Sequence, residues 1–354
     1  MNSSTSSSEP ASHQTWTRFA GWFFGGGLGL GIILYLLIFI IDPFDTLPFS
    51  PPLDRVPIAS NARFSFPALA RKPVYDSAVI GTSTSRLLRP ATLNSAFGGH
   101  FANLAMNSAT AYEQFRLVEV FARNHRDIKT VIVGIDLVWC KTGETFEKYT
   151  PRSFPEWMYD ANPYNDFLHV FNLYTIEQAG RQAGTMLGLR RVKYGRDGYT
   201  NFLPDPAAYD LQKVQASLAI SRKNGIAEAK SAPGADPETL NFPALPMLRD
   251  MLRTLPPQAR KILFIAPYHF ARQSVPGSQT AMEWAECKKN IGAIAAQSPN
   301  TVAADFLIES PLTTQDSNYW DPVHYSVAAA DILMTDLWKL AQGHTSANFR
   351  ILAK

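Results

Sequence analysis

Recognisable motifs that bind metals, nucleotides or nucleic acids are missing from this sequence. No glycine-rich phosphate loop of the Walker type is present, which predicts that no nucleotide binds. The Lys and Arg residues are scattered and the formal net charge is only +3, whereas a nucleic-acid partner would need a basic patch. We therefore expect no cofactor, no metal and no nucleic acid. The histidines without ligand-like neighbours are His100, His125, His169 and His344.

Only two cysteines occur, Cys140 and Cys287. In an oxidising compartment they could pair as a disulfide. Two separate buried thiols are at least as compatible with the sequence, since free cysteine is commonly buried. Their pairing therefore stays open at this point.

Charge is missing altogether from residues 19–41, FAGWFFGGGLGLGIILYLLIFII. As a helix this run is long enough to cross a hydrocarbon core of about 30 Å, although a buried core helix is the alternative. A cleavable signal peptide would have a shorter apolar core and a small-residue cleavage site, and neither is found near Asp42. Arg18 precedes the run while Asp42 and Asp45 follow it, so the positive-inside rule favours a cytoplasmic N-terminus. We predict a single-pass signal anchor in the inner membrane and an extracytoplasmic, periplasmic body.

The segments around this span differ from it in composition. Residues 1–18 begin as a serine-rich polar run and predict a disordered cytoplasmic tail. Residues 42–75 are proline-rich and predict an extended stalk. The main domain is then expected at residues 76–342, and residues 343–354 are expected to be a C-terminal tail.

From residue 76 onward, strand-like and helical patterns alternate. Helical spacing of apolar residues predicts helices at residues 112–124 and 326–340. Strands separated by helices favour a mainly parallel sheet covered on both faces. We therefore predict an α/β fold with a parallel sheet of about five strands flanked by helices. The predicted strands are residues 78–81, 101–104, 130–136, 261–266 and 301–305.

A long segment separates the third and fourth predicted strands. Residues 139–256 are too many for one connection in a compact fold, so they predict an inserted cap. Helical stretches are expected at residues 165–188 and 207–230. The segment is rich in aromatic residues, which could bind sugar rings. We favour their being the insertion's own small core, because aromatics dominate core burial.

The run DSAVIGTSTSR, residues 76–86, reads as a buried strand that ends at Gly81 and opens onto a turn rich in hydroxyl groups. Ligands of α/β proteins bind beyond the carboxyl ends of parallel strands, which makes Ser83 a candidate nucleophile. The alternative is that the hydroxyls of residues 82–85 only cap the next helix.

A second pattern, YWDPVHY at residues 319–325, precedes the last predicted helix. Asp321 and His324 are three residues apart, so the carboxylate can hold one imidazole tautomer while the other ring nitrogen faces a serine hydroxyl. By itself the pattern is weak, because both residues could serve as turn and capping residues. His269, after the fourth strand, could line the same pocket or act as an alternative base, although we favour a structural role.

Together the two patterns resemble the SGNH, or GDSL-like, hydrolase family, over about residues 76–136 and 261–342. In that family a serine follows the first strand, oxyanion donors follow the second and third, and Asp-x-x-His precedes the terminal helix. The resemblance implies a flavodoxin-like sheet. It also implies that Ser83 is the nucleophile and that Asp321 and His324 complete a catalytic triad.

Two further blocks of the family match less closely. Ser108 stands where the family has an oxyanion-hole glycine, although a backbone N–H survives that replacement. Asp136 stands where the family has an asparagine, and an ionised carboxylate would oppose an oxyanion. Three interpretations stay open: Asp136 is protonated or turned away, Asn107 supplies the amide, or the protein is a weak catalyst.

Membrane-tethered members of this family resemble proteins that move acyl groups on cell-wall polymers or exopolysaccharides, such as alginate acetylation and D-alanylation partners. The resemblance therefore implies an esterase or O-acyltransferase whose substrate is an acylated polysaccharide or a small acyl ester. It also implies a membrane-bound acyltransferase as a partner. The alternative is a catalytically inactive scaffold or carbohydrate-binding subunit of a polymer-export or modification complex.

Overall fold

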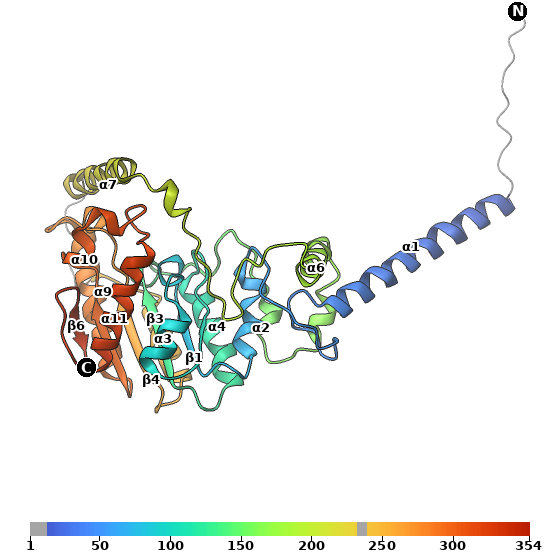
Figure 1. The fold of residues 1–354 in the computed structure, drawn as a ribbon, viewed down its shortest axis with the longest axis horizontal. Coiled ribbons are helices and arrows are strands. Elements are labelled where there is room, and N and C mark those ends of the chain that lie inside the picture. The colour runs from blue at the N-terminus through green and yellow to red at the C-terminus, as the bar shows by residue number, and fades with distance from the viewer. Residues whose placement is uncertain (1–12, 232–238) are drawn as a thin grey trace, which may run out of the picture. The chain divides into compact units, whose positions relative to one another are not determined.

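The computed structural model describes residues 13–231 and 239–354. They form two units (Figure 1). The anchor unit is the described chain up to Arg55 together with Pro163–Arg191, and the sheet unit is Val56–Asn162 together with Val192–Lys354. Residues 1–12 of the predicted disordered tail lie outside the described residues. The rest of that predicted tail, residues 13–18, is helical, because the long apolar helix begins before the uncharged run.

The anchor unit begins with the long apolar helix α1 (His13–Ile41). Its stretch Thr15–Ile41 reaches a mean hydropathy of 2.4, and only 6% of that apolar window is buried. Such a helix is long and apolar enough to cross a membrane, and its exposure differs from that of a buried core helix. Against α1 packs α6 (Leu173–Met186), which follows the short helix η4 (Asn165–Leu168).

The proline-rich segment after α1, predicted to be an extended stalk, is folded. Arg55 donates from Nε to the carbonyl of Ile41 at 2.7 Å, which satisfies a carbonyl that lacks a partner within the helix. The sheet unit then starts with η1 (Ala62–Phe64) and α2 (Phe66–Arg71). A proline lies in the first turn of α2, where no backbone N–H is needed. Pro67 therefore starts a helix, whereas residues 51–59, which include Pro51, Pro52 and Pro57, form no regular secondary structure.

The sheet unit is built on a sheet of six strands in the order β2-β1-β3-β4-β5-β6. The first five strands run parallel, which confirms the predicted α/β class. Nearly all of their residues are buried, as expected of a parallel sheet covered by helices on both faces. These strands are β1 (Ser77–Ile80), β2 (Phe101–Asn103), β3 (Thr130–Ile135), β4 (Arg260–Ile265) and β5 (Thr301–Asp305).

The sixth strand, β6 (Arg350–Ala353), lies in the segment predicted to be a C-terminal tail. It pairs antiparallel with β5. In this position it satisfies backbone groups of β5 that a free edge would expose. A short apolar run at the end of a chain carries too little pattern to distinguish a strand from a tail.

Helices connect the strands and flank them. Thr110 and Glu113 form a capping box at the start of α4, which explains why that helix begins where it does. The two helical stretches predicted within the insertion correspond to α6 and to α7 (Leu211–Ser231), which ends one residue beyond the predicted stretch. The helices of the sheet unit, besides α2, are α3 (Pro90–Phe97), α4 (Ala111–Asn124), α5 (Leu137–Cys140), α7 (Leu211–Ser231), α8 (Leu245–Thr254), α9 (Gln279–Ala296), α10 (Pro311–Thr314) and α11 (Val327–Ala341). Short helices are η2 (Ser83–Ser85), η3 (Glu156–Met158), η5 (Pro206–Ala208), η7 (Phe270–Arg272) and η8 (Asp316–Asn318).

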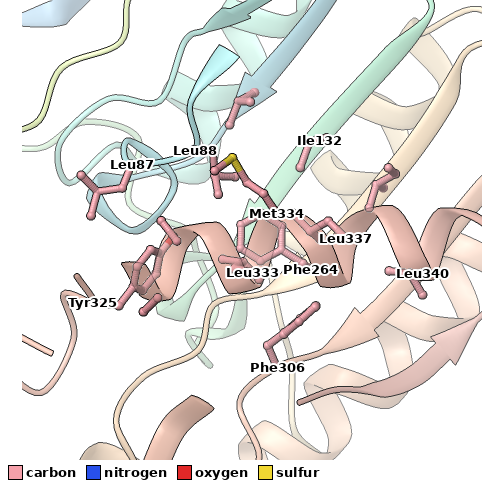
Figure 2. Packing of buried hydrophobic residues seen from close by; sticks show 14 of the residues in the cluster. Leu87, Leu88, Ile132, Phe264, Phe306, Tyr325, Leu333, Met334, Leu337 and Leu340 are labelled. Carbon is pink, nitrogen blue, oxygen red and sulfur yellow. The ribbon is translucent and has the colours of Figure 1, made fainter. Parts of the chain in front are cut away.

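Large apolar side chains hold α11 against the sheet (Figure 2). Leu333, Met334 and Leu337 are fully buried in one cluster with Phe264 of β4 and Ile132 of β3. Each buried side chain of this size stabilises the fold by about 1.5–3 kcal/mol. Because Asp321 and His324 come shortly before α11, this packing also decides where their loop lies.

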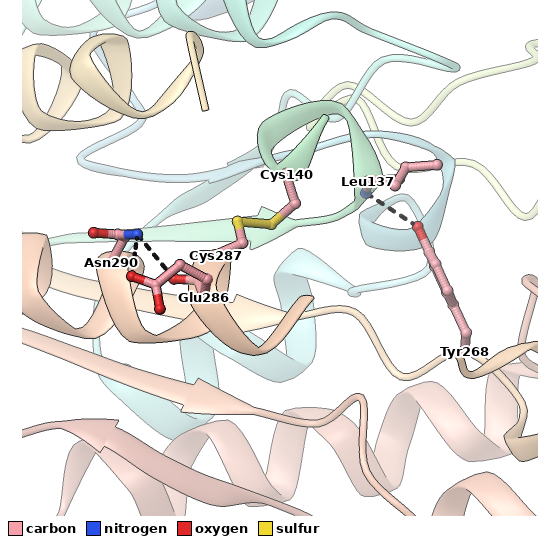
Figure 3. The surroundings of a disulfide bond; sticks show 6 residues. All are labelled: Leu137, Cys140, Tyr268, Glu286, Cys287 and Asn290. Atoms are coloured by element: carbon pink, nitrogen blue, oxygen red, sulfur yellow. Dashed lines mark hydrogen bonds between the residues drawn. A yellow bond between two sulfur atoms is a disulfide. The ribbon is translucent and has the colours of Figure 1, made fainter. Parts of the chain in front are cut away.

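The two cysteines are joined as a disulfide between α5 and α9 (Figure 3). The open question of their pairing is therefore answered in favour of the bond. Cys140 and Cys287 are 147 residues apart, so the bond closes a long loop and restricts the unfolded chain. It also tethers α5, the helix that follows β3.

We predict that removing this bond destabilises the sheet unit by about 2–5 kcal/mol. The measurement is guanidinium unfolding of the full-length chain in detergent, followed by tryptophan fluorescence, for wild type and Cys140→Ser/Cys287→Ser. Reduced wild type should unfold at the same denaturant concentration as the double variant. An unchanged midpoint in both would show that the bond contributes nothing to stability.

Candidate active site

The turn after β1 carries Ser83, at the carboxyl end of the strand where ligands bind in parallel sheets. Gly81 has a φ of +153°, and a Cβ at this position would lie 2.2 Å from Ser85 Oγ. Only glycine therefore fits under this turn. The carbonyl of Gly81 accepts a hydrogen bond from the N–H of Met106 at 3.0 Å, which joins the turn to the segment after β2.

Ser83, His324 and Asp321 form a continuous hydrogen-bonded chain. Ser83 Oγ lies 2.8 Å from His324 Nε2, and His324 Nδ1 lies 2.7 Å from Asp321 Oδ2. The carboxylate can therefore hold the tautomer in which Nδ1 carries the proton and Nε2 accepts one from the serine. This is the arrangement of a nucleophile, a general base and an orienting acid.

Asp321 is fixed by its own loop. Its Oδ1 accepts hydrogen bonds from the N–H groups of Val323 at 2.7 Å and His324 at 2.8 Å. Burial by itself raises the pKa of Asp321, but the hydrogen bonds from His324 and Val323 outweigh it and bring the pKa below its usual value. The carboxylate is therefore ionised at neutral pH. The hydroxyl of Tyr325, next in the chain, donates to the carbonyl of Thr84 and ties this loop to the nucleophile turn.

Asp136, which stands where a side-chain amide was expected, is buried at the end of β3. Its Oδ2 accepts hydrogen bonds from the hydroxyls of Thr82 and of Thr84, the latter at 3.0 Å, and the N–H of Val138 also bonds to the carboxylate. Burial raises the pKa of Asp136 and these bonds lower it by less. Since the two threonines flank Ser83, these hydrogen bonds to Asp136 fix the turn that carries Ser83.

The segment after β2 carries Ser108, which has a φ of +51°. This is the left-handed backbone region that glycine adopts most easily, so the serine keeps a glycine-like conformation. Arg63 holds it there by donating to the carbonyls of Asn107 at 3.3 Å and Ser108 at 3.4 Å. Arg63 is itself paired with Glu113, and both side chains are fully buried.

Two backbone N–H groups at this edge of the sheet are unused. Within the part of the chain that the structure describes, the N–H groups of Ser83 and Ser108 donate no hydrogen bond. Both belong to the segments that follow β1 and β2. Such a pair can stabilise negative charge on a carbonyl oxygen during acyl transfer.

His269 takes a structural position. Its Nδ1 accepts from the N–H of Ala271 at 3.0 Å, and its Nε2 lies 3.2 Å from Asp316 Oδ1. The N–H of His269 donates to the carbonyl of Pro322, within the Asp321 loop, at 3.0 Å. With both ring nitrogens occupied by Ala271 and Asp316, His269 supports the loop.

Two residues near the site, Phe202 and Arg86, were not predicted from the sequence. Phe202 packs edge-on against the His324 ring at 5.5 Å between centroids, and Arg86 lies over the Phe202 ring at 4.8 Å. Arg86 is the last residue of the segment DSAVIGTSTSR, and nothing in the sequence around it indicated a role at the site. Phe202 lies in the insertion and had no sequence signal, because only the tertiary fold brings it to the histidine.

Comparison with known proteins gives no assignment: no family model and no curated protein matches this chain. Among residues 13–231 and 239–354, no group of three or more His, Cys, Asp or Glu side chains is arranged to hold a metal ion. The chemistry of the site is therefore inferred from the geometry of Ser83, His324 and Asp321.

We predict that Asp136→Ala lowers the free energy of unfolding by about 1–3 kcal/mol, because two buried threonine hydroxyls lose their acceptor. Asp136→Asn keeps an acceptor oxygen and removes a buried charge. The raised pKa means that the folded state binds the proton more tightly, so Asp136 reduces stability as pH rises above 3.8, and Asp136→Asn removes this loss. Denaturant unfolding at pH 7 should place Asp136→Asn at or above wild type. A loss equal to that of Asp136→Ala would show that the ionised carboxylate is required.

We predict that His269 contributes to acid sensitivity. Burial lowers its pKa below 6.5 despite the opposing effect of Asp316, so the unfolded state binds the proton more readily. The free energy of unfolding should therefore fall as pH drops through 6.5, by at most about 1.4 kcal/mol per pH unit for one proton. His269→Asn, which can still cap η7, should flatten this part of the curve between pH 7 and 5. Parallel curves for the two proteins would contradict the assignment.

Proposed function

We propose that this protein is a membrane-anchored serine esterase or O-acyltransferase of the SGNH type. The single observation that carries the proposal is the 2.8 Å contact between Ser83 Oγ and His324 Nε2, with Asp321 bonded to the other ring nitrogen. The parallel sheet, with the nucleophile after its first strand, supports the same interpretation.

The proposed reaction is acyl transfer through a covalent intermediate. Ser83 Oγ attacks the carbonyl carbon of an ester while its proton passes to His324 Nε2. The carbonyl electron pair moves to the oxygen, where the N–H groups of Ser83 and Ser108 would bind the negative charge. The ester C–O bond then breaks, and the leaving alcohol takes the proton from His324. Water or a sugar hydroxyl resolves the acyl-Ser83 by the same steps in reverse.

The position of Phe202 bears on the choice between hydrolysis and transfer. Its ring packs edge-on against the His324 ring and places apolar surface beside it. Excluding water around an acyl-enzyme favours attack by a bound sugar hydroxyl over hydrolysis. We therefore propose that the acceptor is a hydroxyl-bearing polymer, with an acylated polysaccharide or a small acyl ester as the acyl donor.

The proposed location is the periplasmic face of the inner membrane. The apolar helix α1 would be the anchor, and a membrane-bound acyltransferase would be the partner that supplies acyl groups. The Cys140–Cys287 disulfide supports an extracytoplasmic body, because such bonds persist in oxidising compartments.

We predict that Ser83→Ala lowers turnover of p-nitrophenyl acetate by the full-length protein in detergent by at least about 10³-fold. Ser95→Ala removes an exposed hydroxyl in α3 and should leave turnover unchanged. A serine-directed fluorophosphonate should label Ser83 in wild type. Mass spectrometry of added oligosaccharides distinguishes the two activities, because acylated sugar appears only if the protein is a transferase.

Equal turnover and no labelling in wild type and Ser83→Ala, with both proteins folded, would contradict this function. The inactive scaffold or carbohydrate-binding subunit would then be the better interpretation. The observation that favours this alternative is the carboxylate of Asp136, which stands where the family has an asparagine.

A further inference from the structure

The anchor unit exposes a group of large apolar side chains close together in sequence. Leu168, Phe171 and Leu173 are 83%, 50% and 85% exposed. They belong to the segment Pro163–Arg191, which the chain enters from the sheet unit and leaves to return to it. A single exposed apolar residue is ordinary, whereas a contiguous group marks an interaction surface. We call these three side chains the apolar patch.

Contacts place the apolar patch beside the C-terminal end of α1. The hydroxyl of Tyr35 donates to the carbonyl of Phe167 at 3.2 Å, and the Tyr35 ring lies 5.9 Å from the ring of Phe171. Phe39 stacks on Phe167 with 6.2 Å between centroids. Figure 1 shows α6 beside the same end of α1, against which it packs. Since α1 ends at Ile41, these contacts lie about 3–9 Å before its end at 1.5 Å per residue.

At this level, the other side of α1 is exposed and apolar. Leu36, Leu37 and Ile40 are exposed, although Ile38 between them is fully buried. One side of the helix therefore contacts the inserted segment, while the other presents apolar surface to its surroundings. Apolar surface of this kind is unfavourable in water and favourable among lipid acyl chains. The inserted segment thus lies level with a part of α1 that is suited to lipid.

The length of the uncharged run agrees with this level. The run starts at Phe19, directly after Arg18, and ends at Ile41. At 1.5 Å per residue it is about 34 Å long, compared with a hydrocarbon core of about 30 Å. A bilayer whose core begins at Phe19 therefore ends close to Phe39, which contacts the inserted segment. The apolar patch then meets the boundary between acyl chains and headgroups.

We propose that the apolar patch is a second membrane contact, in which Leu168, Phe171 and Leu173 enter the lipid leaflet at the C-terminal end of α1. The occupant is the bilayer, because the patch continues the lipid-facing surface of α1. The inference rests on α1 being the membrane anchor of the proposed function. The chain passes between the two units after Arg55, Asn162 and Arg191. The sheet unit is therefore joined to a membrane-bound unit by three connections.

The test uses the full-length chain in vesicles of phosphatidylcholine and phosphatidylglycerol. A nitroxide spin label is attached to one introduced cysteine, since the native cysteines are joined to each other and do not react. Collisions of the label with dissolved oxygen and with a water-soluble nickel chelate are measured by electron paramagnetic resonance. Oxygen is apolar and concentrates among acyl chains, whereas the polar chelate stays in water.

Four variants are compared, with thermal unfolding as the check on folding. Leu168→Cys and Leu173→Cys report on the apolar patch, and Leu36→Cys reports on α1. Ile220→Cys is the matched control, because Ile220 is also an exposed apolar residue but lies on α7 of the sheet unit. Labels at Leu168 and Leu173 should collide more with oxygen than with the chelate, as at Leu36. The label at Ile220 should show the opposite preference.

Chelate-accessible labels at Leu168 and Leu173, with Leu36 in lipid, would overturn the second contact and leave the anchor standing. Shielding of both patch labels from both reagents would also overturn it, since a second copy or another protein would then cover the patch. A chelate-accessible label at Leu36 would overturn the anchor and the inference together. Ser83-dependent ester turnover by the same labelled proteins reports separately on the proposed chemistry.

Discussion

The site depends on one hydrogen bond between residues that are 241 positions apart, Ser83 and His324. Ser83 is placed by the end of β1 and His324 by the loop before α11. Parallel pairing of β1, β3, β4 and β5 puts the carboxyl ends of these strands at one edge, and the apolar packing of α11 brings its loop to that edge. Without this packing, the Asp321 loop would be an ordinary turn.

Two buried acidic side chains, Asp136 and Glu113, fix the segments that carry the candidate site. Asp136 accepts the hydroxyls on both sides of Ser83, and Glu113 pairs with the arginine that holds the Ser108 segment. Both acidic side chains are buried; Asp136 accepts hydrogen bonds and Glu113 forms an ion pair with Arg63. Because an unpaired buried polar group is destabilising by about 1–3 kcal/mol, such contacts tolerate few other arrangements and so specify the turn geometry.

Ser108 and Asp136, the two residues that differ from the pattern the sequence resembles, are both held by specific neighbours. Ser108 keeps the left-handed backbone of a glycine, a conformation that is unfavourable by about 1–2 kcal/mol for other residues, and Arg63 binds its carbonyl. Asp136 accepts hydrogen bonds from the hydroxyls of Thr82 and Thr84, which occupy its Oδ2. A substitution in a motif therefore has to be interpreted with its neighbours, since the same residue type can oppose or support a site.

The sequence by itself determined the apolar span of α1, the alternation of strands and helices, and the residues that meet as Ser83, Asp321 and His324. These features are local: uncharged runs, periodic apolar positions and short spacings carry them. Only the tertiary structure decided the Cys140–Cys287 bond, the pairing of β6 with β5, the folding of the proline-rich segment and the partners of Asp136 and Asn107. Each of these is a contact between segments that are distant in the chain, and its energy depends on burial and geometry that no local pattern contains.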